Sequence, residues 1–160
     1  MEDMKKPEAL MDNEVNKKNH IFVINHYHLG PADPTKPNND YWQYMGDHWG
    51  ISAGDARGRL CANCEHYVQT SEIMDMINNG PAKDFKASSV DPSIVDIESK
   101  PTAWCNMFDI TCSPVRTCTE QEMGGPIDDV KMKAIQLAKS AYENLDIGEF
   151  EDPFEDSIKD

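Results

Sequence analysis

The sequence has no apolar run long enough to cross a bilayer, since its longest, Ile21 to Ile24, has only the length of a short strand. The polar stretch from Met1 to Asn19 also lacks the apolar segment of a secretory signal. We therefore expect neither a membrane anchor nor export, and we expect the chain to stay in a reducing cytoplasm.

Clusters of basic residues are missing too. The chain has 15 Lys and Arg residues against 29 Asp and Glu residues, which gives a formal net charge of -14. Nucleic-acid phosphates attract Lys and Arg clusters and are repelled by a field of this sign. The composition therefore argues against DNA or RNA binding.

Catalytic motifs are absent from the sequence as well. It contains no Ser-His-Asp set, no phosphate-binding loop and no paired-carboxylate motif. We therefore expect a protein that is not an enzyme.

Hydrophobic residues are scarce, at 39% of 160 residues, and the mean hydropathy is -0.65. A small core of this kind often needs a metal or a disulfide to stabilise it. The sequence predicts a small, irregular, loop-rich α+β domain, stapled by a metal cluster, with extended arms at both ends. We expect a flexible or extended N-terminal arm over 1–38, a cysteine-rich domain over 39–127, an amphipathic helix over 128–146 and an acidic tail over 147–160.

Capping residues and apolar spacing indicate four helices. The last of them has an apolar stripe at helical spacing, which predicts docking on the core or on a partner. Ile21 to Ile24 is expected to form a short strand or an anchoring segment. The expected helices span Tyr41 to His48, a short turn begun by the Ser52-Ala53-Gly54-Asp55 capping box, Ser71 to Asn79, and Asp128 or Asp129 to about Leu145, with the stripe on Val130, Ala134, Leu137, Ala138, Ala141 and Leu145.

Five cysteines are present, and an odd number cannot all pair within one chain. Cys61 and Cys64 form a C-x-x-C pair, whose spacing suits zinc sites and iron–sulfur clusters alike. The later cysteines contain no second C-x-x-C pair, which counts against a zinc ribbon. A metal site in a reducing compartment is the leading interpretation. The alternatives are zinc, two disulfides with a free thiol after oxidation, or five thiols that bind nothing.

The segments around the cysteines also carry a family likeness. Cys61-Ala62-Asn63-Cys64-Glu65-His66-Tyr67 is followed by Trp104-Cys105-Asn106-Met107-Phe108 and then by Cys118. This arrangement resembles the ligand loops of high-potential iron–sulfur proteins, although the interval from Cys105 to Cys118 is one residue shorter than is usual there. The resemblance implies one [4Fe–4S] cluster with Cys61, Cys64, Cys105 and Cys118 as its ligands.

A second likeness covers residues 40–127. It is carried by Tyr41 to Met45, the C-x-N-C pair, Trp104-Cys105, Arg116-Thr117-Cys118 and Gly124-Gly125-Pro126-Ile127. These segments resemble small, uncharacterised proteins of tailed phages, marine ones especially. The resemblance implies a virion-associated protein, located in the particle and in the host cytoplasm during assembly.

Residues beside the expected ligands are candidates to tune such a cluster. Hydrogen bonds and packing around thiolate sulfurs moderate their negative charge. Cys112 is either a buried free thiol or an alternative ligand in place of Cys105 or Cys118. We expect Tyr67, Trp104 and Phe108 to form a dry shell and Asn63 and Arg116 to supply hydrogen-bond donors.

The leading function is therefore that of a non-catalytic phage structural protein, in the capsid or as a tail accessory, whose cluster staples a small domain. Its expected partners are neighbouring virion subunits, bound through the N-terminal arm and the C-terminal helix and tail. One alternative is a soluble one-electron carrier, whose acidic face steers a basic partner. The other is a zinc-stabilised adaptor, in which His66 or Cys112 completes the site.

Overall fold

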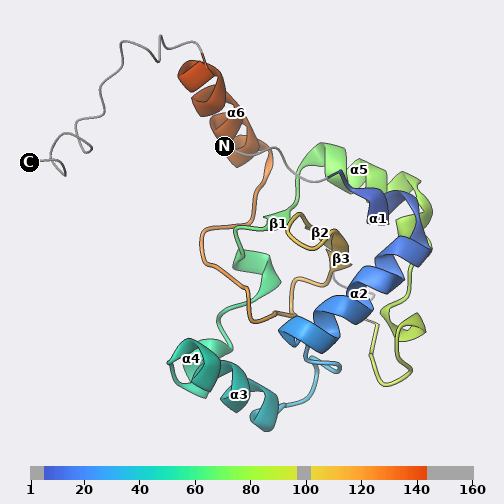
Figure 1. Ribbon diagram of the computed structural model, residues 1–160, viewed down its shortest axis with the longest axis vertical. Helices are drawn as coiled ribbons and strands as arrows, with labels where there is room; N and C mark the ends of the chain where they lie inside the picture. The colour runs from blue at the N-terminus through green and yellow to red at the C-terminus, as the bar shows by residue number, and fades with distance from the viewer. Residues whose placement is uncertain (1–5, 97–101, 144–160) are drawn as a thin grey trace, which may run out of the picture.

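Helices surround a very small antiparallel sheet in this computed structural model, which describes residues 6–96 and 102–143 (Figure 1). The predicted small, irregular, loop-rich α+β class is confirmed. The described elements are α1 Glu8–Met11, α2 Asn13–Tyr27, α3 Asn39–Trp49, α4 Ala53–Ala56, the 3-10 turn η1 Cys61–Asn63, β1 Tyr67–Val68, α5 Ser71–Asn79, the 3-10 turns η2 Pro81–Asp84 and η3 Ala87–Ser89, β2 Ala103–Cys105, β3 Ile110–Cys112 and α6 Asp129–Glu143.

The sheet has the strand order β1-β2-β3, with both pairs antiparallel. Side chains alternate between the two faces of a strand. The register pairs Val68 with Trp104 and Trp104 with Thr111, and these side chains therefore share one face. Cys105 and Cys112 lie on the other face.

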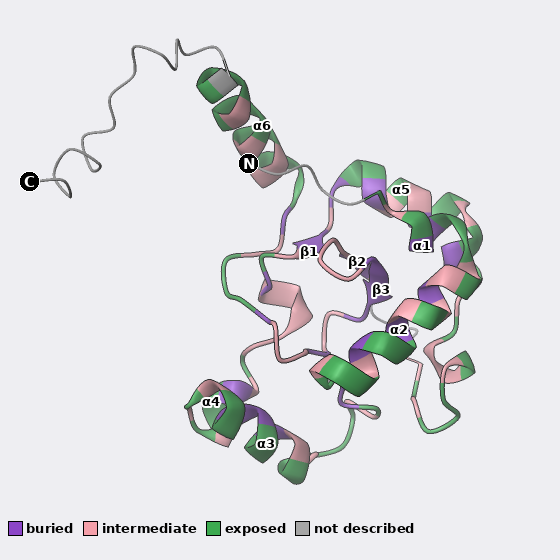
Figure 2. Cartoon of the chain, in the orientation of Figure 1, coloured by how far each residue is buried: buried purple, intermediate pink, exposed green. Residues whose placement is uncertain are grey.

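The main hydrophobic core lies on the Trp104 face. There α1 and α2 contact β3, and α5 contacts β2. Burial of each leucine, isoleucine or valine side chain in this core contributes about 1.5–3 kcal/mol to the free energy of unfolding. Figure 2 shows buried residues gathered on the strands and on the sides of α1, α2 and α5 that face them. The core consists of Leu10, Val68, Ile73, Ile77, Ala82, Trp104 and Ile127.

The N-terminal segment differs from the prediction of an extended arm over 1–38. Residues 8–27 form α1 and α2, and Leu10 and Asn16 are fully buried. The Asn16 side chain donates to Thr111 Oγ1 at 2.8 Å and accepts from the Thr111 backbone N–H at 3.1 Å. The Ala9 N–H donates to the buried Asp109 carboxylate. These contacts make the segment part of the fold. Ile21 to Ile24 lie in α2, so the short strand that was one of the two forms expected for them is wrong.

Local capping explains why several predicted helices begin where they do. Ser52 Oγ accepts from the Asp55 N–H at the start of α4, as its capping box predicted. Thr70 caps α5, whose bounds agree with the predicted Ser71 to Asn79. The Asp129 carboxylate also accepts from the Ser71 N–H at 2.8 Å, which ties the starts of α5 and α6 together.

Helix α6 extends away from the rest of the molecule (Figure 1). Its cap is Asp128, whose Oδ1 accepts from the Lys131 N–H at 2.8 Å. Of the described α6 side chains, Met132 and Ile135 pack against the main core. The predicted apolar stripe is exposed instead, with Val130 at 79% and Leu137 at 61%, and it does not dock on the described part of the chain.

The predicted acidic tail, residues 147–160, lies outside the described residues. None of the described helices is long and apolar enough to span a membrane.

Candidate metal centre

The C-x-x-C pair lies on the 3-10 turn η1 and is fixed by backbone hydrogen bonds on two sides. The Cys61 N–H donates to the Arg116 carbonyl at 2.7 Å, and the Cys64 N–H returns to the Cys61 carbonyl at 3.0 Å. Asn63 Oδ1 accepts from the Leu60 N–H at 3.1 Å and from Gln121 Nε2 at 2.8 Å. Hydrogen bonds within the protein thus hold the turn without a metal. Its geometry depends on a segment more than 50 residues away in sequence.

The glycine turn near residue 125 packs directly on this pair. The Gly125 N–H donates to the Asn63 carbonyl at 3.1 Å. A Cβ atom at Gly125 would lie 1.7 Å from the Cys64 carbonyl oxygen, so no larger residue fits without moving the backbone. The Gly-Gly-Pro-Ile turn therefore acts as a support for the cysteine turn.

Cys105 and Cys112 come from the β2–β3 hairpin. Their shared sheet face also carries Tyr67 and Ala103, and Cys64, Tyr67, Ala103 and Cys112 form a second, separate buried cluster. The Tyr67 hydroxyl donates to the Cys112 carbonyl at 2.7 Å and accepts from the Ala103 N–H at 3.1 Å. Tyr67 thus fixes the hairpin beside the thiols.

All five cysteines are free thiols. The Sγ atoms of Cys61 and Cys112 are 2.7 Å apart. Cys64, Cys105 and Cys118 each interact electrostatically with Cys112 as well. Cys112 thus lies near every other thiol, and its direct contact is with Cys61, whereas the sequence-based alternative had it replacing Cys105 or Cys118.

The protein environment opposes thiolates at these positions unless a cation is bound. The hydrogen bond to Cys112, followed by burial, raises the pKa of the Cys61 thiol. Burial raises the pKa of Cys64 and Cys118, and that of Cys105 to about 12. Metal ligation requires deprotonated thiols, so a metal would supply the missing charge.

Backbone N–H groups partly counter this rise in pKa at three of the thiols. Hydrogen bonds of this kind stabilise thiolates and are a feature of metal–thiolate sites. Cys61 and Cys112, by contrast, contact each other. The N–H groups belong to Glu122 and His66 at Cys64, to Phe108 and Met107 at Cys105, and to Glu120 at Cys118.

The spacing of the thiols bears on which metal suits them. A single tetrahedral zinc ion with Zn–S bonds of about 2.3 Å holds its sulfurs about 3.8 Å apart. Among the described residues, no three thiols have their sulfurs within 4.8 Å of one another. A four-iron cluster places an iron between each thiolate and the centre, which requires a wider set of sulfurs. The thiols of the described residues therefore do not form a preformed tetrahedral zinc site.

Of the three aromatic residues expected to form a dry shell, only Tyr67 lies with thiols in the described structure. Tyr67 and Trp104 are both 1% exposed, but only Tyr67 is in the cluster of buried residues that contains thiols. Trp104 Nε1 donates to Asp109 Oδ1 on the opposite face, and Phe108 packs on Tyr27.

Neither predicted donor side chain reaches a thiol in the described structure. Asn63 Nδ2 donates to the Gly58 carbonyl at 2.7 Å. The Arg116 guanidinium donates to backbone carbonyls of two other loops. The donors near the thiols are backbone N–H groups, which sequence reasoning did not identify.

A second group of possible metal ligands was missed in the sequence. Side-chain atoms of Glu65, His66 and Glu122 all lie within 4.8 Å of one another. They meet because the Glu65 N–H donates to the Glu122 carbonyl at 2.8 Å, a pairing that sequence spacing does not reveal. His66 thus lies with two carboxylates, in a group that includes no thiol.

Comparison with protein-family models, with curated proteins and with solved structures gave no match to this chain.

Proposed function

We propose that the cysteine site holds a [4Fe–4S] cluster and that the protein is a non-catalytic structural component stapled by it. The ligands we assign are Cys61, Cys64, Cys105 and Cys118, with Cys112 beside Cys61. The observation that carries this proposal is the convergence of thiols from three separate segments, three of them with backbone N–H donors. Among the described residues, no three of their sulfurs lie within 4.8 Å of one another.

The architecture supports a stapling role. The strands have only two or three residues each, and a sheet this small has little stability of its own. A metal centre joining η1, the β2–β3 hairpin and the segment at Cys118 would close long chain loops. Its binding free energy would then contribute directly to folding. The cluster chemistry itself would require only four thiolates and a dry surrounding, to which Tyr67 contributes.

We further propose the phage particle as the setting, on the resemblance of residues 40–127. The surface available for neighbouring subunits is the α6 stripe, in which Val130, Ala134 and Leu137 are exposed. An exposed apolar face of this kind is typical of an interaction surface. Because the N-terminal segment forms α1 and α2 of the fold, it is not a free arm for contacts between subunits. This proposal therefore assigns those contacts to α6 and the C-terminal tail.

Ligand variants test the proposal. Cys64→Ser removes a thiol with N–H donors and should abolish iron binding and lower the unfolding midpoint in urea. Cys112→Ser is the matched control and should retain iron, since Cys61 remains. Retention of iron and stability in both variants would contradict a cysteine-bound cluster. Loss of iron only in Cys112→Ser would contradict our ligand assignment.

A one-electron carrier is the second candidate, favoured by the partial exposure of Cys61, Cys105 and Cys118. Exchange of electrons with a partner requires a cluster close to the surface. A redox titration of the anaerobically purified protein separates the two functions. Reversible cycling with a basic redox partner supports the carrier, whereas a cluster that is lost on cycling supports the staple.

A further inference from the structure

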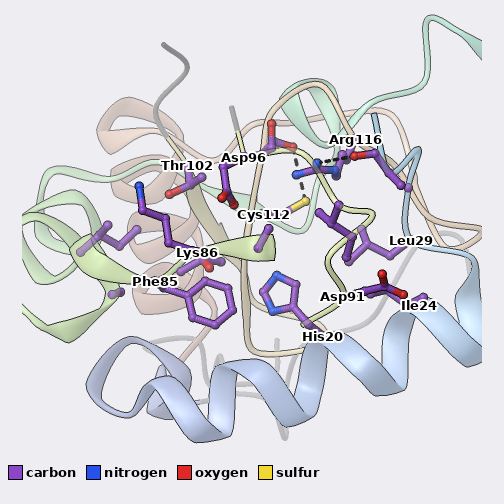
Figure 3. Close-up of a pocket in the computed structure, with 18 of the residues that line it drawn as sticks. His20, Ile24, Leu29, Phe85, Lys86, Asp91, Asp96, Thr102, Cys112 and Arg116 are labelled. Atoms are coloured by element: carbon purple, nitrogen blue, oxygen red, sulfur yellow. Dashed lines mark hydrogen bonds between the residues drawn. The ribbon is translucent and has the colours of Figure 1, made fainter. Parts of the chain in front are cut away.

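A cavity of about 600 Å³ lies between α2, α5 and the edge of β3 (Figure 3). Its volume is in the range of sites that bind small organic molecules. It is distinct from the thiol group but shares a wall with it, because Cys112 lines the cavity while its Sγ contacts Cys61.

Much of the cavity wall is apolar. Ile24 from α2, Ile77 from α5 and the loop residues Leu29 and Phe85 line it. The ring of His20 packs on Phe85 with 5.0 Å between ring centroids. In Figure 3 these two rings lie side by side, with Cys112 and Arg116 across from them. Such walls suit the apolar body of a ligand.

The buried cation of the cavity is Arg116, which is 7% exposed. Other charged residues that line the cavity are Lys83, Lys86, Asp91 and Asp96. Its Nε donates to the Pro31 carbonyl at 3.0 Å, and its Nη2 donates to the carbonyls of Ala32 at 3.0 Å and Val95 at 2.6 Å. These bonds orient the guanidinium but add no negative charge. No carboxylate of the described residues forms an ion pair with it within 4.0 Å, and Asp96 and Asp33 attract it only from a greater distance. A buried charge without a directly paired counter-ion is costly.

The acidic groups of the cavity accept hydrogen bonds from neighbouring serines. Asp96 accepts from the N–H and hydroxyl of Ser88 at 3.0 and 2.7 Å. Asp91 accepts from the Ser93 N–H at 2.8 Å. Burial lowers the pKa of His20 to about 4, so this ring is neutral at pH 7. Within the described residues, the cavity thus retains a cation with no directly paired anion, inside a protein of net charge -14.

We propose that this cavity binds a small organic carboxylate with an apolar body. The carboxylate pairs with Arg116, and the apolar body lies against Ile24, Leu29 and Phe85. The occupant also lies against Cys112 and so covers one side of the thiol group. This site does not depend on the metal proposed above, because none of the groups that form it except Cys112 is a thiol.

Three probes with the same eight-carbon body and different head groups test the charge requirement: octanoate, 1-octanol and octylammonium. Binding to the full-length chain is followed by amide chemical shifts. Octanoate should shift the amides of Thr111, Ser113 and Arg116 and should bind about tenfold or more tightly than 1-octanol, because a charge-assisted contact contributes at least this much. Octylammonium should bind most weakly. Equal affinity for octanoate and 1-octanol, or no octanoate binding at millimolar concentration, would overturn the proposal.

Two pairs of variants locate the site. Arg116→Gln should weaken octanoate binding about tenfold and leave 1-octanol unchanged, whereas Arg57→Gln, on the remote α3–α4 unit, should change neither. Should Arg116→Gln fail to fold, the cavity-filling Ile24→Trp should abolish binding of both probes. Its control on the same helix, Ile21→Trp, should not, because Ile21 is exposed and does not line the cavity. Unchanged octanoate affinity in Ile24→Trp would refute the site.

Discussion

Burial of His20 makes the stability of this protein depend on pH. The side chain is 6% exposed on α2, and its Nδ1 is 2.8 Å from the Asn16 carbonyl oxygen. Burial lowers its pKa from 6.5 to about 4. Above pH 6.5 the ring is neutral in both the folded and the unfolded chain. Between pH 6.5 and 4 only the unfolded chain binds the proton, so the free energy of unfolding falls as the pH falls.

The shift sets the size of this effect. Each pKa unit corresponds to about 1.36 kcal/mol, so the loss is about 2 kcal/mol at pH 5 and about 3 kcal/mol once the pH reaches 4. Carboxylates and thiols titrate as well, and the informative quantity is therefore the difference between the wild-type chain and His20→Gln, which keeps a donor but does not titrate.

Urea unfolding between pH 7.5 and 5 measures this difference. The stability advantage of the wild-type chain over His20→Gln should shrink by about 2 kcal/mol across this range. His26→Gln, an exposed position on the same helix, is the control and should keep a constant difference from the wild type. A constant difference for His20→Gln as well would refute the placement of α2 against β3 with a buried neutral histidine.

Three further predictions concern the anchors of the fold and its exposed helix. Asp109→Ala removes the acceptor for the Ala9 and Trp104 N–H groups, and should lower the free energy of unfolding by about 2–4 kcal/mol; a loss below about 1 kcal/mol in urea titrations would contradict the anchoring of α1. Gly125→Ala forces a Cβ into the Cys64 carbonyl and should reduce both stability and metal content. A Cβ at Gly54 would meet only the Ser52 hydroxyl, at an ordinary contact distance of 3.9 Å, so Gly54→Ala should leave metal content unchanged; equal effects of the two changes would argue against the turn as a support. Leu137→Gln should change the free energy of unfolding by less than about 0.5 kcal/mol, because the side chain is 61% exposed, and a larger loss by thermal or urea unfolding would mean that the α6 stripe packs on the chain itself.

Helix boundaries set by local chemistry were predictable from the sequence. Ser52 and Thr70 begin α4 and α5 because their hydroxyls accept backbone N–H groups a few residues later, and such caps need no tertiary context. The thiol group was predictable only in part. That Cys61, Cys64, Cys105 and Cys118 share one metal site stays a prediction from their spacing. The contact of Cys112 with Cys61 depends on the register of the β2–β3 hairpin, which the cysteine spacing does not encode.

Helix α2 was missed because its buried side does not look apolar. Asn16 and His20 occupy that side, and their polar atoms are satisfied by Thr111 and by the backbone. Hydrophobic periodicity in the sequence identifies a helix by its apolar stripe. A buried helix side made of hydrogen-bonded polar residues therefore gives no such signal. The opposite error occurred at α6, where a clear apolar stripe around Val130 and Leu137 stays exposed. A stripe identifies a helix but not the surface that covers it.

The proposed metal centre is tested most directly by assaying iron, zinc and acid-labile sulfide on the anaerobically purified chain. A [4Fe–4S] cluster predicts about four iron and four sulfide per chain with no stoichiometric zinc. Cys64→Ser should lose both iron and sulfide, and Cys112→Ser should keep them. Zinc without iron or sulfide in the wild-type chain would contradict the account.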